Sequence, residues 1–356
     1  MREESEKTEG LPGKIKVSVC IPTRNRANFI GEALESIISQ SGDNVEIVIV
    51  DGASTDNTAG AVQKYQEKFK NLVYYCGKEN GGVDRDMAKA IELSRGEYCW
   101  LFSDDDVLKP GAMKLILKEI ESVYDVYLSN VTVCDFYMRP LRERFWLSRK
   151  VNNRVFNLHN KDELIEYFNC ANSIGALFSY WSSIVLRREQ WKKAGYIYEF
   201  EGTAYALASS LFSLFKQKCR LKYIRSSLVF WRNDNVSFQD EGGLVKRFLL
   251  DFDGYSKLAD KFLLEDFKVR NAFLGVMRRE HPWYSVIHAT SLINDQQGWL
   301  KFKNKLIAYG YSPVMVEFCW ILSRNKSLVG IAVKLKRKLI RSGKLRSGLF
   351  LNDKTI

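Results

Sequence analysis

Three aspartates in a row follow a hydrophobic stretch of the chain. The segment Trp100–Pro110, WLFSDDDVLKP, begins with apolar residues and then places Asp104, Asp105 and Asp106 side by side. Neighbouring carboxylates repel one another, and each is well solvated only by water or by a counter-charge. A surface loop would hold them at little cost. A bound divalent cation would instead offset the repulsion, because Mg²⁺ and Mn²⁺ take oxygen ligands.

The elements before this triplet alternate in a regular way. Apolar runs typical of buried strands alternate with amphipathic stretches typical of helices. The strand-like runs are Lys16–Pro22, Val45–Asp51, 71–76 and 97–102, and the helical patterns are 27–40, 58–69 and 86–94. This alternation predicts an α/β fold, Rossmann-like, with a mostly parallel sheet and helices on both faces. In such sheets ligands bind beyond the carboxyl ends of the strands, where the acid triplet also lies.

The order of elements changes after about residue 125. Short strands are expected between 124 and 158, a strong helix over Thr203–Gln217 and a pair of strands over 219–232. Beyond about Gly242 the pattern is helical to the end. We therefore expect a flexible N-terminus at 1–14, a main domain at 15–240 whose first half ends near 125, and a helical region at 241–356.

Composition argues against several other classes of protein. The seven cysteines are spread singly without C-x-x-C spacing, which favours buried thiols in a reducing compartment over a disulfide framework or a zinc site. The sequence shows no signal-peptide core and no apolar run of about 18 residues, so a cytoplasmic location is expected. Neither G-x-G-x-x-G nor G-x-x-x-x-G-K-[ST] follows the first strand, which argues against hydride transfer and P-loop phosphoryl transfer.

Positive charge is concentrated near the C-terminus. The net charge is +12, and between Ser323 and Asn352 nine residues are basic and none is acidic. Laid on a helix, the segment 323–350 places apolar residues on one stripe and basic residues away from it, a pattern typical of an anionic membrane surface. A solvated helix packed on its own domain is the alternative. Nucleic acid is not expected as a partner, since no nucleic-acid-binding module is recognisable.

Four motifs occur in a fixed order along the first 118 residues. They are VSVCIPTRNRANFIGEALESIISQ, VEIVIVDGASTDNT, ENGG and ELSRGEYCWLFSDDDVLKPGAM. Together they resemble the family 2 glycosyltransferases, which have the A-type, nucleotide-sugar-binding glycosyltransferase fold. The resemblance covers Lys16 to about Lys118 and is weaker to about Phe238. Within the family the chain is most similar to bacterial abequosyltransferase-like enzymes of surface polysaccharide assembly.

The resemblance implies contacts to the donor. Thr23 and Asp51 match nucleoside contacts, although Asp51 alone would be read as a turn residue. Arg85 matches a position near the base, ribose or phosphate, but Asp86 follows it where the family has asparagine. Arg232 matches a diphosphate contact, with a loop-fixing salt bridge as the alternative. The full set expected to bind the donor is Pro22, Thr23, Arg24, Asp51, Asp84, Arg85, Asp104 and Arg232.

The acid triplet departs from the family's Leu-Asp-x-Asp-Asp motif, because Ser103 stands where the first aspartate belongs. We expect Asp105 and Asp106 to bind Mg²⁺ or Mn²⁺, with Asp105 among the catalytic residues and Asp104 in contact with sugar or ribose. A pair formed by Asp104 and Asp106 is the alternative. The metal would stabilise the charge that develops on the leaving diphosphate.

An inverting transferase also needs a general base for the acceptor hydroxyl. The family places this base at the start of a helix in the second half, often as Glu-Asp. This chain has YEFEGTAYALASS there, and Glu201 is the candidate, with Glu199 beside it. Acids at the start of a helix are also ordinary capping residues, which is the alternative.

The resemblance implies an inverting transferase that moves a sugar, with a deoxyhexose as candidate, from a nucleotide-diphosphate donor. The acceptor would be a lipid-linked glycan or polysaccharide, in O-antigen or other cell-surface glycan synthesis, with the enzyme peripheral on the inner face of the membrane. A non-catalytic scaffold remains an alternative because the first aspartate and the Glu-Asp pair are missing. A sugar nucleotidyltransferase is disfavoured, since IPTRNRANF has no glycine.

Overall fold

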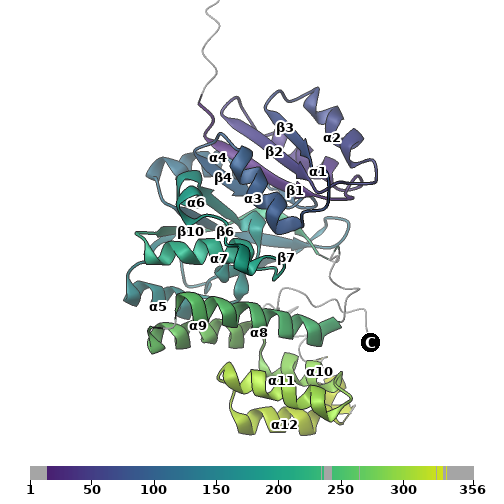
Figure 1. Cartoon of the computed structure of the whole chain (residues 1–356), viewed down its shortest axis with the longest axis vertical. Helices are drawn as coiled ribbons and strands as arrows, with labels where there is room; N and C mark the ends of the chain where they lie inside the picture. The colour runs from purple at the N-terminus through teal and green to yellow at the C-terminus, as the bar shows by residue number, and fades with distance from the viewer. Residues whose placement is uncertain are drawn as a thin grey trace, which may run out of the picture. The chain divides into compact units, whose positions relative to one another are not determined.

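The computed structural model describes residues 14–233, 235, 243–263, 265–325, 327–331 and 334 (Figure 1). The chain divides into two compact units. The first comprises residues up to Val123 together with 185–192, and the second comprises 124–184 and the residues from 193 on. The N-terminus expected to be flexible lies outside the described residues except for Lys14, and so does most of the basic segment 323–350.

A mostly parallel sheet forms the centre of the first unit. Its strands are β1 (Val17–Thr23), β2 (Val45–Asp51), β3 (Leu72–Cys76), β4 (Tyr98–Leu101) and β9 (Ile184–Arg187). They follow the order β3-β2-β1-β4-β9, and only β9 is antiparallel to its neighbour. Every residue of β1, β2 and β4 is buried, which explains why these strands are apolar throughout rather than alternating.

Helices cover this sheet, as the sequence predicted. The helices of the first unit are α1 (Ile30–Ile38), α2 (Thr58–Gln66), α3 (Val83–Leu93) and α4 (Ala112–Glu119), and a short strand β5 (Val107–Leu108) precedes α4. On α1 the residues Ile30, Ala33, Leu34 and Ile37 are buried, which is the helical spacing that a covered face requires. The expected strand–helix alternation is therefore confirmed.

A buried glutamate joins the amino ends of these strands. Glu46 on β2 is fully buried and accepts hydrogen bonds from the Ser18 hydroxyl at 2.6 Å and from the Arg95 backbone N–H at 2.6 Å. The Arg95 Nε lies 2.8 Å from the second carboxylate oxygen. A buried carboxylate is tolerated only when it is paired and hydrogen-bonded in this way.

The second unit contains a smaller set of strands. The strands β6 (Val126–Cys134) and β10 (Arg220–Arg232) are parallel, with β7 (Pro140–Arg144) antiparallel to β6 and β8 (Arg154–Asn157) antiparallel to β10. The prediction of two strands over 219–232 is wrong. The polar residues near Ser227 form a bulge, where the register with β6 shifts, rather than a turn.

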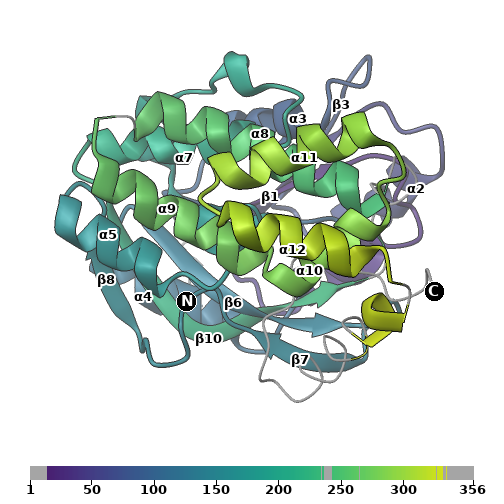
Figure 2. The same cartoon turned by 90° about the horizontal axis from the view of Figure 1, so that it is seen from below.

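Helices make up the rest of the second unit. They are α5 (Lys161–Cys170), α6 (Arg188–Ala194, which begins in the first unit), α7 (Ala206–Ser213), α8 (Gly243–Phe262), α9 (Phe267–Glu280), α10 (Trp283–Ser291), α11 (Gln296–Ala308) and α12 (Pro313–Ser323). The view from below shows α8 to α12 grouped together (Figure 2). The helical C-terminal region is therefore confirmed over the described residues. Among the helices of the described chain, none combines the length and the apolar character that a membrane span requires.

One helix is shorter than the sequence predicted. The strong helix expected over Thr203–Gln217 begins at Ala206 and gives way to a 3₁₀ turn at Leu214–Lys216. Its serines bond back to backbone carbonyls, as when the Ser209 hydroxyl donates to Ala206 O at 2.7 Å. Such bonds compete with regular helix geometry, which explains the early end.

Replacing Glu46 with glutamine tests the buried carboxylate. The amide has one acceptor oxygen where the carboxylate has two, so at least one buried or half-buried donor loses its partner. We expect Glu46→Gln to lower the free energy of unfolding by about 1–3 kcal/mol, measured by urea denaturation. Glu35→Gln, on the exposed side of α1, should change it by less than about 0.5 kcal/mol. Equal effects of the two changes would contradict the role given to Glu46.

Candidate active site

The parallel register brings the first two predicted donor residues together. Thr23 and Asp51 are partners at the carboxyl ends of β1 and β2, and the Gly52 N–H donates to Thr23 O at 2.9 Å. Pro22 is buried in β1, and Arg24 is exposed in the loop that follows. The prediction that polar residues gather where these strands end is confirmed for this pair.

The loops that follow β1 and β2 are fastened to each other. The Asn25 N–H donates to Ser54 Oγ at 2.8 Å, and the Thr55 N–H donates to the Asn25 carboxamide oxygen at 2.8 Å. The Ala27 N–H donates to Asp56 Oδ2 at 3.1 Å. Asn25 and Ala53 both have positive φ, of 56° and 58°, which lets the two loops turn toward each other. This network of hydrogen bonds fixes the backbone that carries Arg24.

Asp51 is fully buried and already has two protein partners. Its Oδ1 accepts from the Ser54 N–H at 2.7 Å, and its Oδ2 accepts from the Tyr74 hydroxyl at 2.7 Å. Burial and the Asp51 charge raise the pKa of Tyr74, so its hydroxyl stays protonated and donates. In this structure Asp51 therefore organises the turn after β2. A turn residue was the alternative that the sequence left open for this position.

A second acid lies over this turn, and the sequence did not single it out as a site residue. Asp86, in the first turn of α3, is so close to Gly52 that a Cβ at position 52 would lie 2.6 Å from Asp86 Oδ2. Burial raises the pKa of Asp86 from its ordinary 3.8 to about 6, Asp51 adds to the rise and Arg24 opposes it. The sequence signal that could have identified Asp86 is that the family has asparagine at this position.

The neighbours of Asp86 on α3 point in different ways. Asp84 is buried and Arg85 is exposed, as expected for successive residues on a helix that covers a sheet. The ENGG turn before them needs glycine, because Gly82 has φ of 85° and its N–H donates to Asn80 Oδ1 at 3.1 Å. This turn sets where α3 begins and so which of its acids faces Gly52.

The acid triplet begins three residues after β4. Asp104 and Asp106 are buried, whereas Asp105 is partly exposed and accepts from the Ser103 hydroxyl at 2.6 Å. Asp104 Oδ1 lies 3.6 Å from Arg26 Nε, a contact that sequence reasoning missed although TRNR carries two arginines. Burial raises the pKa of Asp104 to about 7, Asp105 adds to the rise and Arg26 opposes it.

The acid triplet fits a divalent cation only if other ligands than protein side chains complete the coordination of the ion. Among the described residues no three His, Cys, Asp or Glu side chains are placed to hold a metal ion together, so an all-protein cage is not present there. Mg²⁺ usually needs only one or two carboxylates, with phosphate and water completing its shell. Burial is the largest cause of the raised pKa of Asp104 and the charge of Asp105 adds to it, and a nearby cation would oppose both effects. The residues therefore fit a metal that arrives with a phosphate ligand.

Glu201 and Arg232 belong to the second unit. Arg232 is buried at the end of β10 and donates from Nη1 to Phe136 O at 2.5 Å. Glu201 is partly exposed and follows a 3₁₀ turn at Tyr198–Phe200. The helix α7 begins only at Ala206, and no side chain caps it, so the capping explanation for Glu201 is wrong.

Helix α8 holds the Glu201 segment on both sides. Before Glu201, the side chain of Glu199 pairs with Lys261 of α8. After it, the Tyr205 hydroxyl donates to the buried carboxylate of Asp251, which also pairs with Arg247 and lies 3.0 Å from His281 Nε2. These contacts fix the backbone on either side of Glu201 and leave that residue between two anchored points.

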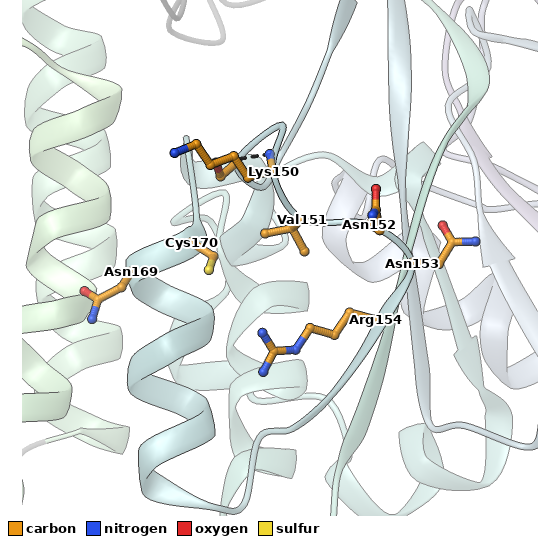
Figure 3. Close-up of a pocket in the computed structure, with 8 residues that line it drawn as sticks. Lys150, Val151, Asn152, Asn153, Arg154, Asn169 and Cys170 are labelled. Carbon is orange, nitrogen blue, oxygen red and sulfur yellow. Dashed lines mark hydrogen bonds between the residues drawn. The ribbon is translucent and has the colours of Figure 1, made fainter.

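A surface pocket of about 440 Å³ lies in the second unit, and none of the predicted site residues lines it (Figure 3). Its lining residues are Ser148, Lys150, Val151, Asn152, Asn153, Arg154, Asn169 and Cys170. The Arg154 guanidinium is held by both carboxylate oxygens of Glu166, at 2.5 and 2.6 Å. The pocket thus brings amide and cationic groups together but includes none of the acids.

Comparison with known proteins decides the family. Residues 18–180 match the model of "Glycosyl transferase family 2". The abequosyltransferase RfbV of Salmonella typhimurium is 35% identical over 273 residues, which cover 75% of this chain and 81% of that protein. The chain belongs to glycosyl transferase family 2. The acid triplet and the loops after β1 and β2 of this family 2 glycosyltransferase lie within the matched residues 18–180.

Solved structures share the fold of this family 2 glycosyltransferase. The structure of S. aureus TarS 1–349 in complex with UDP-GlcNAc matches with a TM-score of 0.61 at 18% identity, over 93% of each chain. The mannosyltransferase PcManGT of Pyrobaculum calidifontis, in complex with GDP-Man and Mn²⁺, matches with a TM-score of 0.52 at 16% identity, over 93% of this chain and 87% of that one. At these identities the likeness concerns the fold.

Replacing Asp86 with asparagine tests its raised pKa. The folded protein holds the Asp86 proton more tightly than the unfolded chain does, so ionisation of wild-type Asp86 destabilises the fold as the pH rises through 4 to 6. We expect Asp86→Asn to raise the melting temperature by roughly 1–4 °C at pH 7.5, with the gain vanishing below about pH 4. Calorimetry across pH measures this. Asp43→Asn, on an exposed loop, should show no such trend, and a pH-independent gain for Asp86→Asn would contradict the assignment.

Proposed function

We propose that the chain transfers a sugar from a nucleoside diphosphate donor to a glycan hydroxyl in cell-surface polysaccharide synthesis. The observation that carries this proposal is the acid triplet after β4, with Asp104 and Asp106 buried, in a chain of glycosyl transferase family 2. The donors named for TarS and PcManGT, UDP-GlcNAc and GDP-Man, support a nucleotide-sugar donor on this fold. Similarity to an abequosyltransferase supports a deoxyhexose as the sugar.

Base recognition is assigned to Asp86 rather than to Asp51. Both oxygens of Asp51 have protein partners, Ser54 in the turn and Tyr74 on β3, whereas the Asp86 carboxylate faces Gly52, where no side chain intervenes. A carboxylate accepts hydrogen bonds from ring N–H or amino groups of a nucleobase. Arg24 approaches the same glycine and would meet the phosphate or ribose of the donor.

A divalent metal is part of the proposal. Asp105 and Asp106 would hold Mg²⁺ or Mn²⁺, which would supply positive charge to the diphosphate as its bond to the sugar breaks. Asp104 is held near Arg26 and would contact the sugar or ribose. Ser103 donates to Asp105 and so orients this carboxylate, which compensates in part for the aspartate that is missing from the family motif.

The acceptor side of the reaction is assigned to the second unit. Glu201 would take the proton from the acceptor hydroxyl, with inversion at the sugar carbon. Its partial exposure and the anchoring of its neighbours Glu199 and Tyr205 to α8 support this role. The acceptor would be lipid-linked, and the enzyme peripheral on the inner membrane surface, which the basic C-terminal sequence favours.

Donor hydrolysis tests the metal site and the scaffold alternative together. We expect slow, Mn²⁺-stimulated hydrolysis of the correct nucleotide sugar, found with a panel of donors that differ in base. Asp105→Ala with Asp106→Ala should reduce it by about 100-fold or more, because charge on the leaving diphosphate loses its compensation. Glu121→Ala, an exposed acid beyond α4, should leave the rate unchanged. No turnover of any donor by the wild type would favour the non-catalytic scaffold.

Acceptor transfer tests Glu201 separately from the donor site. We expect Glu201→Gln to reduce transfer to acceptor by about 100-fold while donor affinity stays unchanged, since only the proton transfer is lost. Glu199→Gln, whose carboxylate is occupied by Lys261, should reduce transfer far less. Radiolabelled transfer and donor binding by calorimetry measure the two effects. Similar losses for both variants would show that Glu201 acts through the loop structure alone.

A further inference from the structure

The last fully described helix, α12, is apolar on nearly every side. Its sequence PVMVEFCWILS contains one charged residue, Glu317, and this carboxylate pairs with Lys303 of α11. A helix that is apolar all round is usually buried in a core or in a membrane. Helix α12 packs against α10 and α11 on one side, so its other side needs an explanation (Figure 2).

The two sides of α12 differ in burial but little in chemistry. Val316 and Cys319 are buried on the packed side. The opposite side exposes Val314, Phe318 and Ile321, at 77%, 49% and 66%, and these residues follow the i, i+4, i+7 spacing of one helical face. Met315, beside them, is 44% exposed. We call Val314, Met315, Phe318 and Ile321 the α12 face.

Aromatic and basic groups border this face. Trp320 stacks on Trp299 of α11 with ring centroids 4.4 Å apart, and the Arg324 guanidinium lies 3.5 Å from the Trp320 ring centroid. The next helical residues expose two more apolar side chains, Leu328 and Ile331. Tryptophan and arginine beside exposed apolar residues are typical of the boundary between acyl chains and headgroups.

Charge indicates what covers the α12 face. The sequence from Ser323 to Asn352 carries nine basic residues and no acidic one, directly after α12. A protein partner of ordinary composition would leave most of this charge unmatched. An anionic bilayer offers acyl chains for the apolar side chains and negative headgroups for the basic ones.

We propose that the α12 face inserts into the surface of an anionic lipid bilayer, with Arg324 at the lipid headgroups and the positive charge of the following sequence favouring an anionic surface. This deepens the proposed function, on which it rests for the membrane location of the acceptor. The inserting surface begins at Val314, nine residues before the basic segment 323–350 that the sequence alone indicated, so the two contributions can be separated by mutation.

Vesicle co-sedimentation of the full chain tests the insertion. Vesicles of phosphatidylcholine with about 30% phosphatidylglycerol should bind the wild type, and pure phosphatidylcholine should bind it at least about ten-fold more weakly. The triple variant Val314→Ser, Phe318→Ser, Ile321→Ser should bind anionic vesicles about ten-fold more weakly than the wild type. Binding that does not differ between triple variant and wild type would overturn the proposal.

A matched control separates the α12 face from exposed apolar residues in general. Phe267 begins α9 in the same unit and is 81% exposed, more than Phe318. Phe267→Ser should leave vesicle binding unchanged, whereas Phe318→Ser alone should weaken it. Equal losses for the two single variants would count against a specific inserting surface.

Two other occupants of the α12 face give different results. If a second copy of the chain covers it, the wild type sediments as a dimer that the triple variant dissociates, and vesicle binding does not depend on the face. If residues 335–356 cover it, deleting them strengthens vesicle binding instead of weakening it. Either result overturns the proposal.

Donor hydrolysis, measured on the same samples, keeps this inference apart from the proposed function. The triple variant should hydrolyse the nucleotide sugar at the wild-type rate, because none of its residues belongs to the acid sites. A wild type that binds vesicles through the α12 face but hydrolyses no donor would refute the proposed function and leave the membrane surface standing. Hydrolysis without vesicle binding would do the reverse.

Discussion

The candidate site of the first unit depends on the burial of acidic side chains at one edge of a parallel sheet, where they also repel one another. The carboxyl ends of β2 and β4 and the start of α3 bring acids to places where water is scarce. Each acid is compensated differently. Asp51 accepts hydrogen bonds from Tyr74 and from its own turn. The positive charge of Arg24 opposes the rise in the pKa of Asp86, and Asp104 lies near Arg26. Asp51 therefore organises the backbone of its turn, whereas Asp86 and Asp104 are the acids that we propose contact the donor.

The sheet itself was predictable because its physical signal is strong and local. A strand buried on both faces must be apolar throughout, and β1, β2 and β4 are. Placing Thr23 beside Asp51 required only that parallel strands end at one edge. The single long strand β10 was missed, because a bulge with polar residues looks the same in sequence as a short turn.

The partners of the site residues were not predictable to the same degree. Asp86 reaches Gly52 because of the turn at Gly82 and because position 52 has no side chain, and neither relation shows in the spacing of residues. The pairing of Arg26 with Asp104 joins positions 78 residues apart. Resemblance to the family indicated the regions of the site, whereas long-range contacts show which side chains lie together within them.

The contact between α8 and the Glu201 segment limits how family members can be recombined. A Cβ at Gly254 would lie 2.1 Å from the Tyr205 ring, so the helix and the tyrosine fit only as a pair. Chimeras that exchange the C-terminal helices between transferases would need to carry the stretch from Tyr198 to Tyr205 with them. A crossover placed between Tyr205 and α8 would combine residues from two proteins that do not fit each other at positions 205 and 254. We expect such a hybrid to misfold, so that its acceptor preference could not be measured.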